Sequence, residues 1–266
     1  MLDLEFAELS HPGKVREHNE DFIGHVTPAS ADEAKARSWL FALADGVGGQ
    51  DMGEVASHLA VETVQSGFRD FRSNETPTAC LQRLVQAANV KVFETAAAAT
   101  PGGCSMSTTL VACLLRYDRV TIAHVGDSRC YLIRRGHATQ LTHDHTLVGE
   151  QVRLGLLSET EAAESEKRHL LSRSLGSQAV VSAEIDEHQL LPSDVLMLSS
   201  DGLHGCLSSH EIAVLIGKFQ YLDDAAQALI STACENDGSD NISVQLIRVK
   251  GVERMGMYRG RPYRRR

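Results

Sequence analysis

The sequence lacks the features that mark membrane-spanning, exported and multidomain proteins. A membrane-spanning helix needs about 18 consecutive apolar residues, and no apolar run in the sequence approaches that length. Residues 1–6 alternate apolar and acidic side chains, where a signal peptide would carry a basic and then an apolar region. No linker rich in proline, serine and glycine divides the 266 residues, and no internal repeat is visible. We therefore expect a soluble, cytoplasmic protein with a single domain over residues 1–249.

Closely spaced cysteine pairs are also absent. The six cysteines form no Cys-x-x-Cys pair and lie mostly in apolar surroundings. This pattern favours reduced, buried thiols and argues against a disulfide framework or a cysteine-bound zinc ion. The six residues are Cys80, Cys104, Cys113, Cys130, Cys206 and Cys234.

Positive charge is concentrated at the end of the chain. Residues 250–266 carry seven basic side chains against Glu253, a net of +6, so the total of −9 leaves −15 on residues 1–249. Such a tail is typical of a solvated, disordered end, although it could also contact an acidic partner, a membrane surface or nucleic acid. We interpret residues 250–266 as a disordered basic tail and do not expect nucleic-acid binding.

Apolar periodicity divides the rest of the chain into strands and helices. Short apolar runs predict strands over residues 4–9, 21–26, 39–44, 110–115, 120–125, 130–133, 184–190, 195–198 and 241–249. Apolar residues at three-and-four spacing predict helices over residues 55–71, 76–93, 208–216 and 222–235. The polar residues 143–182 predict a largely helical, mobile flap.

The connections between neighbouring predicted strands indicate the fold class. The turns near residues 117–118 and 126–127 are short, and short turns favour antiparallel pairing because parallel strands need longer crossovers. We therefore expect an α+β fold in which antiparallel sheets pack together under helices. A doubly wound parallel sheet is the alternative.

Four short acidic clusters stand beside predicted strands, far apart in the chain. They are Asn19–Asp21, Asp45–Gly46, Ser200–Gly202 and Asp240–Asn241. Folding could bring their carboxylates together at one rim of a sheet, where they would repel one another strongly unless cations compensated their charge. This pattern favours a metal-assisted hydrolase.

The segment that follows Asp45 joins a predicted strand to a predicted helix. A dinucleotide-binding Gly-x-Gly-x-x-Gly loop would need glycine at the position of Asp51. The glycines of this segment instead allow a sharp turn, so that Asp45 and the Gly46 carbonyl can face one ion. All-oxygen ligands suit Mg²⁺ or Mn²⁺, and two such ions about 4 Å apart lower the pKa of a shared water towards neutrality. A phosphoryl group is the natural target.

Six motifs occur in the order and rough spacing of one known family. They are Arg16–Asp21, Asp45–Gly49, Ser107–Thr109, Val125–Arg129, Ser200–Leu203 and Ser239–Ile242. In these motifs the chain resembles the metal-dependent protein phosphatases of type 2C in their compact bacterial form, and the match runs from about residue 13 to residue 249. The resemblance implies an αββα sandwich of two antiparallel sheets flanked by helices. It also implies hydrolysis of phosphoserine and phosphothreonine in proteins.

The resemblance implies a metal-binding role for five residues. Asp45 would bridge two Mn²⁺ or Mg²⁺ ions. Asp201 and Asp240 would complete the ligands of one ion, and Glu20 and the Gly46 carbonyl would serve the other.

Three further residues would act beside the two ions. Asp21 would contact the ions and orient the attacking water, and Arg16 would bind the substrate phosphate through a charge-assisted fork. Asp127 would help to hold a third, weaker ion. The alternatives are an ion pair between Arg16 and a neighbouring carboxylate, and a purely structural turn at Asp127. The flap would tune substrate choice. The enzyme would be a monomer, and its substrates would be proteins that a bacterial Ser/Thr kinase has phosphorylated.

Two positions depart from the family pattern. Val47 stands where many eukaryotic relatives have a histidine proposed as general acid, and a positioned acid is typically worth about 10² to 10⁴ in rate. Either water held at the ions protonates the leaving alkoxide, or turnover is slower. Ser107 replaces the usual glycine before Thr108 and Thr109, and we interpret it as a packing change in a buried strand.

Other interpretations of particular residues compete with these assignments. His143 and His145 lie two positions apart in a polar loop, which is more typical of exposed side chains than of metal ligands. Cys113 and Arg119 match the Cys-x₅-Arg spacing of thiol phosphatases, but the residues between them contain no glycine and continue an apolar strand. A non-catalytic phosphoprotein-binding module and a metal-dependent phosphodiesterase acting on nucleotides are the alternative functions.

Overall fold

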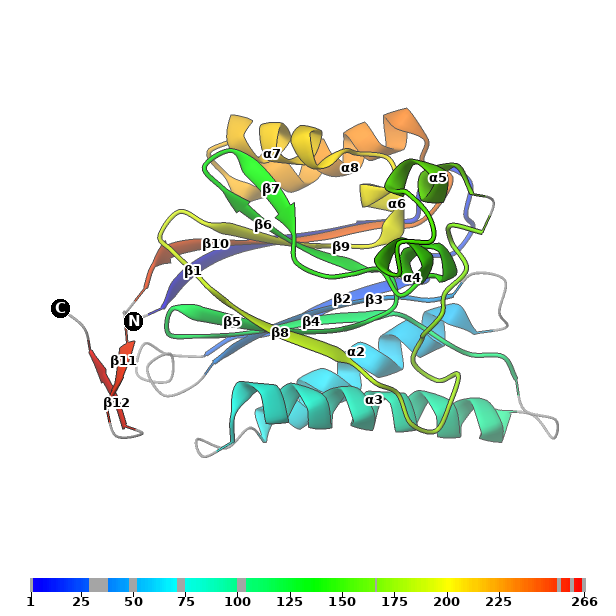
Figure 1. Ribbon diagram of the computed structural model, residues 1–266, viewed down its shortest axis with the longest axis horizontal. Helices are drawn as coiled ribbons and strands as arrows, with labels where there is room; N and C mark the ends of the chain where they lie inside the picture. The colour runs from blue at the N-terminus through cyan, green and yellow to red at the C-terminus, as the bar shows by residue number, and fades with distance from the viewer. Residues whose placement is uncertain are drawn as a thin grey trace.

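Two five-stranded antiparallel sheets pack face to face in the computed structural model of the chain (Figure 1). The structure describes residues 2–28, 38–47, 52–70, 75–99, 104–165, 167–252, 255–258 and 261–264. The first sheet has the strand order β2 (Asp21–Val26), β3 (Trp39–Asp45), β4 (Leu110–Arg116), β5 (Arg119–Val125) and β8 (Glu184–Gln189). The second sheet has the order β1 (Asp3–His11), β10 (Ile242–Gly251), β9 (Val195–Ser199), β6 (Arg129–Arg134) and β7 (His137–Gln140).

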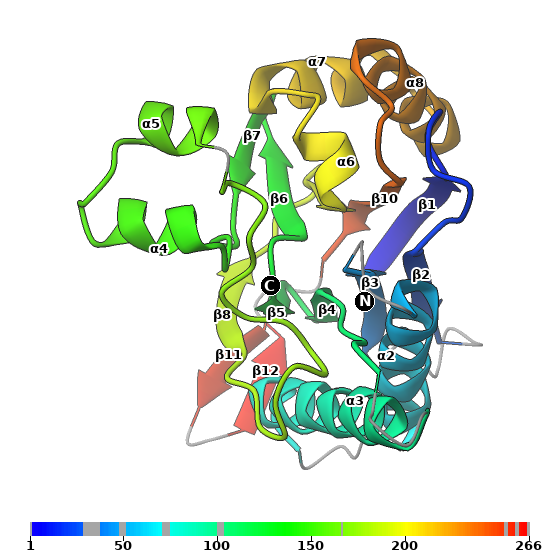
Figure 2. The same ribbon diagram turned by 90° about the vertical axis from the view of Figure 1, so that its right-hand side faces the viewer.

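Helices cover the outer faces of both sheets (Figures 1 and 2). The first sheet is covered by α2 (Gly53–Arg69) and α3 (Pro77–Ala99), and the second by α7 (Ser209–Lys218) and α8 (Leu222–Asn236). The order helix, sheet, sheet, helix confirms the predicted αββα sandwich. The parallel, doubly wound alternative is wrong, because every strand pair described in the two sheets is antiparallel.

The central strands are apolar on both faces because each face meets a different layer. In β3, Leu40 and Ala42 belong to the cluster packed against α2 and α3. Phe41 and Leu43 point the other way, into the cluster between the two sheets. Successive side chains of a strand alternate between faces, so a strand in the middle of a four-layer structure must be apolar throughout. The sheet edges carry the polar residues instead.

The covering helices follow the predicted spacing and carry local start signals. In α2 the buried stripe includes Ala56, Ala60 and Val64, at intervals of four residues. Before α7, the Ser208 side chain accepts a hydrogen bond from the Glu211 amide, while the Glu211 carboxylate accepts from the Ser208 amide. This reciprocal capping satisfies two amides that the first helical turn leaves without partners.

The flap contains less helix than the sequence predicts. Between residues 143 and 182 the structure has only two short helices among its described residues, α4 (Leu147–Arg153) and α5 (Glu159–Glu164). The prediction of a largely helical segment is therefore wrong. Weak apolar periodicity explains the error, because a segment without a continuous apolar stripe has little packing energy to extend a helix. Residues 167–183 form turns and irregular chain, with isolated β-bridges at Leu171 and Leu175.

The basic tail also differs from its expected disorder. Met255–Tyr258 and Arg261–Arg264 pair as the antiparallel strands β11 and β12, apart from the two five-stranded sheets. The expectation of buried cysteines holds for Cys80, Cys113 and Cys130, whereas the other three are partly exposed. All six are free thiols. Among the described residues, no helix combines the length and apolar character needed to cross a bilayer.

Packing between the two sheets gives a direct test of the sandwich. Phe41 is 0% exposed, and its ring lies 5.3 Å from that of Phe6 on the opposing sheet. We expect Phe41→Ala to lower the free energy of unfolding by about 3–5 kcal/mol, because it leaves a cavity between the sheets. Urea denaturation measures this loss. The matched control is Phe93→Ala on α3, where the ring is 36% exposed and truncation costs much less; equal losses would contradict the described core.

Candidate metal centre

Asp21 and Asp45 face each other at one end of the first sheet. Their Cα atoms are direct partners in the β2–β3 register, so the start of one strand meets the end of the next. The Gly46 amide extends this pairing by donating a 3.0 Å hydrogen bond to the Glu20 carbonyl. The strands therefore bring together two acidic clusters that lie more than twenty residues apart in the chain.

Asp201 approaches this pair from the second sheet. It is the first residue of the short helix α6 (Asp201–His204), directly after β9. The preceding residue connects the sheets, because the Ser200 hydroxyl donates a 2.7 Å hydrogen bond to Asp21 Oδ2. The Ser243 amide in turn donates to the Ser200 hydroxyl over 2.9 Å. Ser200 thus fixes the Asp21 carboxylate and the start of α6 in one arrangement.

The electrostatics of the clustered carboxylates favour bound cations. Burial, opposed in part by hydrogen bonds from Ser243 and Ser200, raises the pKa of Asp21 to about 7. Burial and the charges of Asp21, Asp201, Asp127 and Asp240 raise the pKa of Asp45 well above its ordinary value. Asp21 Oδ1 is buried and has no hydrogen-bond partner. An unpartnered, buried carboxylate oxygen among like charges is what a hard divalent cation would satisfy.

Glu20 and the Gly46 backbone form a second pair of oxygen donors beside Asp45. A Cβ atom added to Gly53 would lie 2.7 Å from Glu20 Oε1 and 3.3 Å from the Gly46 carbonyl carbon, so both groups border the same small space. A Cβ atom on Gly46 would collide with the Gly53 carbonyl. These close approaches explain the glycines at the two positions. Burial raises the pKa of Glu20, although the nearby Arg16 opposes this.

Asp240 and Arg16 form an ion pair at the exposed side of the group. Arg16 Nη2 lies 2.9 Å from Asp240 Oδ2, and the two side chains are 40% and 38% exposed. Asp240 Oδ1 accepts a hydrogen bond from the Asn241 amide. The alternative expected for Arg16, pairing with a neighbouring carboxylate, is therefore present in the structure. Its phosphate-binding role stays a prediction.

Asp127 lies on the inner side of the same group. It is 8% exposed, and burial, followed by the charges of Asp201 and Asp144, raises its pKa to about 7. The preceding Gly126 has a φ of +103°, and a Cβ atom there would meet Thr109 Cγ2 at 2.6 Å. Glycine is required by both backbone and packing, and it turns Asp127 towards the other carboxylates.

Three residues that the sequence did not mark for this role hold the carboxylates in place. The Asn241 side chain accepts from the Glu20 amide over 2.8 Å and donates to the carbonyls of Pro12 and His18. The Thr109 hydroxyl accepts from the Asp45 amide over 2.9 Å.

Thr108 completes this framework around Asp45. Its hydroxyl donates to the Asp45 carbonyl over 2.8 Å, and the Thr109 amide donates to the same carbonyl. The two threonines therefore position a carboxylate, in addition to the packing role expected for this segment. Ser107 is buried and holds the Val47 amide through its backbone carbonyl.

His169 is a further residue that sequence reasoning missed. It lies in the flap, and its Nδ1 atom is 3.6 Å from Asp201 Oδ2. Interaction with Asp201 raises the pKa of His169 despite partial burial. No sequence signal identifies this contact, because it depends on how the flap returns over the strand ends. The flap thereby places an imidazole beside the carboxylate group.

Two other sequence interpretations have clear outcomes. The expectation that His143 and His145 are both exposed is wrong for His145, which is 1% exposed. Cys113 is 0% exposed with its Sγ 3.7 Å from that of Cys130. The contact with Cys130 and burial raise the pKa of the Cys113 thiol well above its ordinary value, which is unsuited to a nucleophile. Gly48, Gly49 and Asp51 of the loop after Asp45 lie outside the described residues.

Comparisons with known proteins agree with this geometry. The family described as "Protein phosphatase 2C" matches residues 8–242. A "Serine/threonine phosphatase stp" of Listeria innocua is 33% identical over 252 residues, which cover 94% of this chain and 95% of that protein. The solved serine/threonine phosphatase of S. agalactiae is 33% identical, with a TM-score of 0.84, and the match covers 93% of this chain and 100% of that one.

A third relative was solved with metal. The catalytic domain of the serine/threonine protein phosphatase PstP, in complex with two manganese ions, is 32% identical with a TM-score of 0.80, covering 94% of this chain and 100% of that one. Together the fold, the carboxylate group and these matches define a phosphoprotein hydrolase. The chain belongs to the protein phosphatase 2C family, which confirms the predicted class of protein Ser/Thr phosphatase.

Repulsion among the carboxylates predicts how stability depends on pH and metal. Raised carboxylate pKa values mean that metal-free protein loses stability as the pH rises from the unfolded value near 4 towards about 7. In EDTA at pH 8, we expect Asp45→Asn to raise the free energy of unfolding by about 0.5–2 kcal/mol, and by less at pH 5. Urea denaturation at both pH values measures this.

The control for this prediction is the exposed Asp223→Asn on α8, which should change little at either pH. Saturating Mn²⁺ should reverse the effect, because an ion that binds only the folded protein stabilises wild type more than the variant. An Asp45→Asn variant that is less stable than wild type in EDTA at pH 8 would contradict the proposed repulsion.

Proposed function

We propose that this protein hydrolyses phosphoserine and phosphothreonine in proteins at a centre of two Mn²⁺ or Mg²⁺ ions. The observation that carries the proposal is the meeting of Asp21, Asp45 and Asp201 at the joined ends of both sheets, where the pKa values of Asp21 and Asp45 are raised and one Asp21 oxygen has no partner. The donors around this point are oxygen atoms, which suit these hard cations. When bound, the ions would supply charge compensation, a Lewis acid for the phosphoryl group and an activated water.

Each carboxylate has a role that follows from its place. The charges of four other carboxylates act on Asp45, so we assign it the bridging position. Asp201 and Asp240 would serve one ion, and Glu20 with the Gly46 carbonyl the other. Asp21, held by Ser200 at 2.7 Å, would present its free oxygen to the ions and to the attacking water.

Asp127 is proposed to hold a third, weaker ion together with Asp201. Support comes from its burial and from the contribution of Asp201 to its raised pKa. A structural turn alone would not need a carboxylate in this electrostatic setting, because an amide could make the same turn without the cost of burying charge.

Arg16 is proposed to bind the substrate phosphate. Its partner Asp240 would turn to a bound ion, and the guanidinium would then be free to form a forked contact with phosphate oxygens. The pKa of Arg16 is raised: burial lowers it, but Asp240 and the other carboxylates outweigh this, so the group is a fixed positive charge. Val47 offers no side-chain proton donor, so either water held at the ions would protonate the leaving alkoxide or turnover would be slower.

The cellular setting follows from the family and is part of the proposal. We propose that residues 1–249 act as one monomeric phosphatase unit in the bacterial cytoplasm, on proteins phosphorylated by a Ser/Thr kinase. Bacterial relatives named "Serine/threonine phosphatase stp" and "Protein phosphatase PhpP" support this setting. The buried thiols fit a reducing compartment.

Metal dependence tests the proposed function first. We expect EDTA to abolish hydrolysis of a phosphothreonine peptide, Mn²⁺ to restore it, and Asp201→Asn to lower kcat/KM at least about 100-fold, because an ion loses a ligand. Phosphate release measures the rates, and circular dichroism confirms the fold. Asp223→Asn is the matched control with unchanged kinetics.

Other outcomes would support the rival functions. Activity that survives EDTA but is lost in Cys113→Ser would indicate a thiol mechanism. A protein that binds phosphopeptide but no Mn²⁺ in calorimetry would indicate a non-catalytic binding module. Faster turnover of a cyclic dinucleotide than of the peptide would indicate a phosphodiesterase.

The role of Arg16 has its own test. We expect Arg16→Ala to raise KM for the phosphopeptide about tenfold or more, because a charged hydrogen bond contributes about 1.5–3 kcal/mol, and Arg16→Lys to recover part of the loss. Steady-state kinetics at saturating Mn²⁺ measure both variants. If Arg16 serves only to pair with Asp240, KM will stay unchanged while the affinity for Mn²⁺ changes. Arg69→Ala, at an exposed position near the end of α2, is the control.

A further inference from the structure

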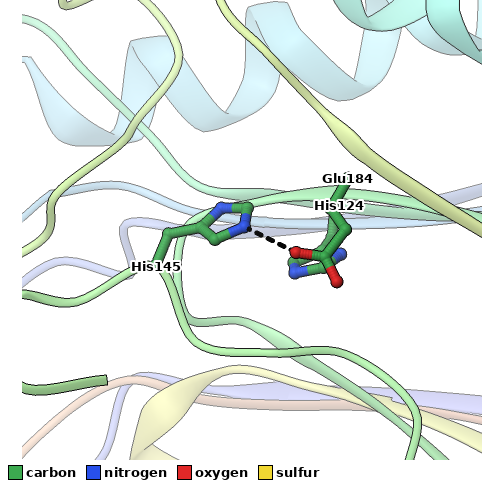
Figure 3. A group of neighbouring side chains, drawn as sticks. All are labelled: His124, His145 and Glu184. Atoms are coloured by element: carbon green, nitrogen blue, oxygen red, sulfur yellow. Dashed lines mark hydrogen bonds and ion pairs between the residues drawn. The ribbon is translucent and has the colours of Figure 1, made fainter. Parts of the chain in front are cut away.

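A second cluster of metal-binding residue types lies outside the proposed phosphatase centre. His124 near the end of β5 and Glu184 at the start of β8 are direct partners in the strand register. His145, in the chain between β7 and α4, stacks on His124 with ring centroids 4.6 Å apart. The two histidines are 2% and 1% exposed, and Glu184 is half-buried. Figure 3 shows the three side chains converging.

The possible ligand atoms of this cluster lie close together, and small side-chain movements would bring all three to one ion. One potential ligand atom from each of the three residues lies within 4.8 Å of the others. His145 Nε2 and Glu184 Oε2 are 3.4 Å apart. This is long for a hydrogen bond, but it is about the separation of two donors that each bind a tetrahedral zinc ion at about 2.0–2.2 Å.

Neighbouring groups prepare two of the three ligands in the way that metal sites do. His124 Nε2 lies 2.9 Å from the His143 carbonyl, which places the ring proton on Nε2 and leaves the lone pair on Nδ1. The second oxygen of Glu184 is held by His143 Nδ1 at 2.8 Å. Outer contacts of this kind fix the tautomer and orientation of metal-binding histidines and carboxylates.

The charges of the cluster are also those that a cation requires. Burial lowers the pKa of His124, and burial with the charge of His124 lowers the pKa of His145 to about 4, so both rings are neutral at pH 7. Burial disfavours the ionised form of Glu184, but hydrogen bonds from His143 and His145 hold its pKa below the ordinary value. Both imidazoles are therefore neutral, and zinc binding at His145 Nε2 requires that its ring proton move to Nδ1.

We propose that His124, His145 and Glu184 form a binding site for a zinc ion, separate from the all-oxygen phosphatase centre. Imidazole nitrogens favour Zn²⁺ over Mg²⁺ and Mn²⁺, so the two sites differ in the metal that they select. The ion joins two strands of the first sheet to the segment that enters the flap. Solvent or His143, which is exposed, supplies the fourth ligand.

Zinc at this site would reach the turn that carries Asp127. The His145 amide donates to the Gly126 carbonyl over 2.9 Å, and the Gly126 amide donates to His145 Nδ1 over 3.2 Å. A metal at Nε2 requires the ring proton on Nδ1, so binding exchanges the second of these contacts for a metal bond. Zinc thus loosens one contact at the Asp127 turn while it fixes the flap to β5 and β8.

The test uses folded protein in which the phosphatase centre cannot compete for metal. In an Asp45→Asn/Asp201→Asn background, titration of ZnCl₂ against a chromophoric chelator should show one equivalent of bound zinc. Glu184→Gln and His145→Gln in the same background should each weaken binding at least about tenfold. His137→Gln, an exposed histidine of β7, is the matched control and should leave zinc affinity unchanged.

The zinc-binding measurements test the proposed site even if one of the two variants does not fold. Glu184 is only half-buried, so its variant serves where His145→Gln fails. Co²⁺ bound to the parent background should give the intense visible bands of a four-coordinate site with imidazole ligands. No bound zinc in the parent, equal zinc affinity in Glu184→Gln and the parent, or Co²⁺ bands typical of all-oxygen ligation would each overturn the site. None of these results depends on phosphatase activity, so they leave the proposed function separately testable.

Discussion

Repulsion among buried carboxylates is the constraint on which the rest of the proposed centre depends. Asp21 and Asp45 are paired across two strands, and Asp127 and Asp201 add charge from other elements. Burial and neighbouring charges raise the pKa values of Asp21, Asp45 and Asp127, so the group opposes its own assembly without cations. The αββα core, apolar on both faces of its central strands, stabilises the strand ends against this repulsion. The carboxylates that would bind the metal ions are therefore also the groups that destabilise the metal-free protein.

Uncharged polar side chains hold the carboxylate residues in place. Thr109 and Thr108 bond the Asp45 main chain, Ser200 bonds the Asp21 side chain, and Asn241 holds the Glu20 amide. Because the framework uses uncharged groups, it can fix the site without neutralising it. The charge that remains is available to divalent ions, and this links the fold to phosphoryl transfer. The imidazoles of His124 and His145, by contrast, form a neutral cluster suited to a softer ion.

The sequence predicted the layers and the acidic group because both leave local patterns. Apolar runs ending in aspartate mark Asp45 and Asp201 as strand-end residues, and motif order added the family. Contacts made between distant segments leave no such pattern. The approach of His169 to Asp201 depends on the path of the flap, and the burial of His145 depends on β5–β8 pairing, which sets Glu184 opposite His124. The flap was also misjudged, because weak periodicity cannot separate short helices from turns.

The most direct test of the central claim is a crystal structure of the protein grown with manganese and measured at the manganese absorption edge. The account predicts two strong anomalous peaks within the group formed by Asp21, Asp45 and Asp201, with Asp45 contacting both. It also predicts that Arg16 separates from Asp240 when the ions are bound. Peaks elsewhere on the surface, with these carboxylates bonded only to protein and water, would contradict it.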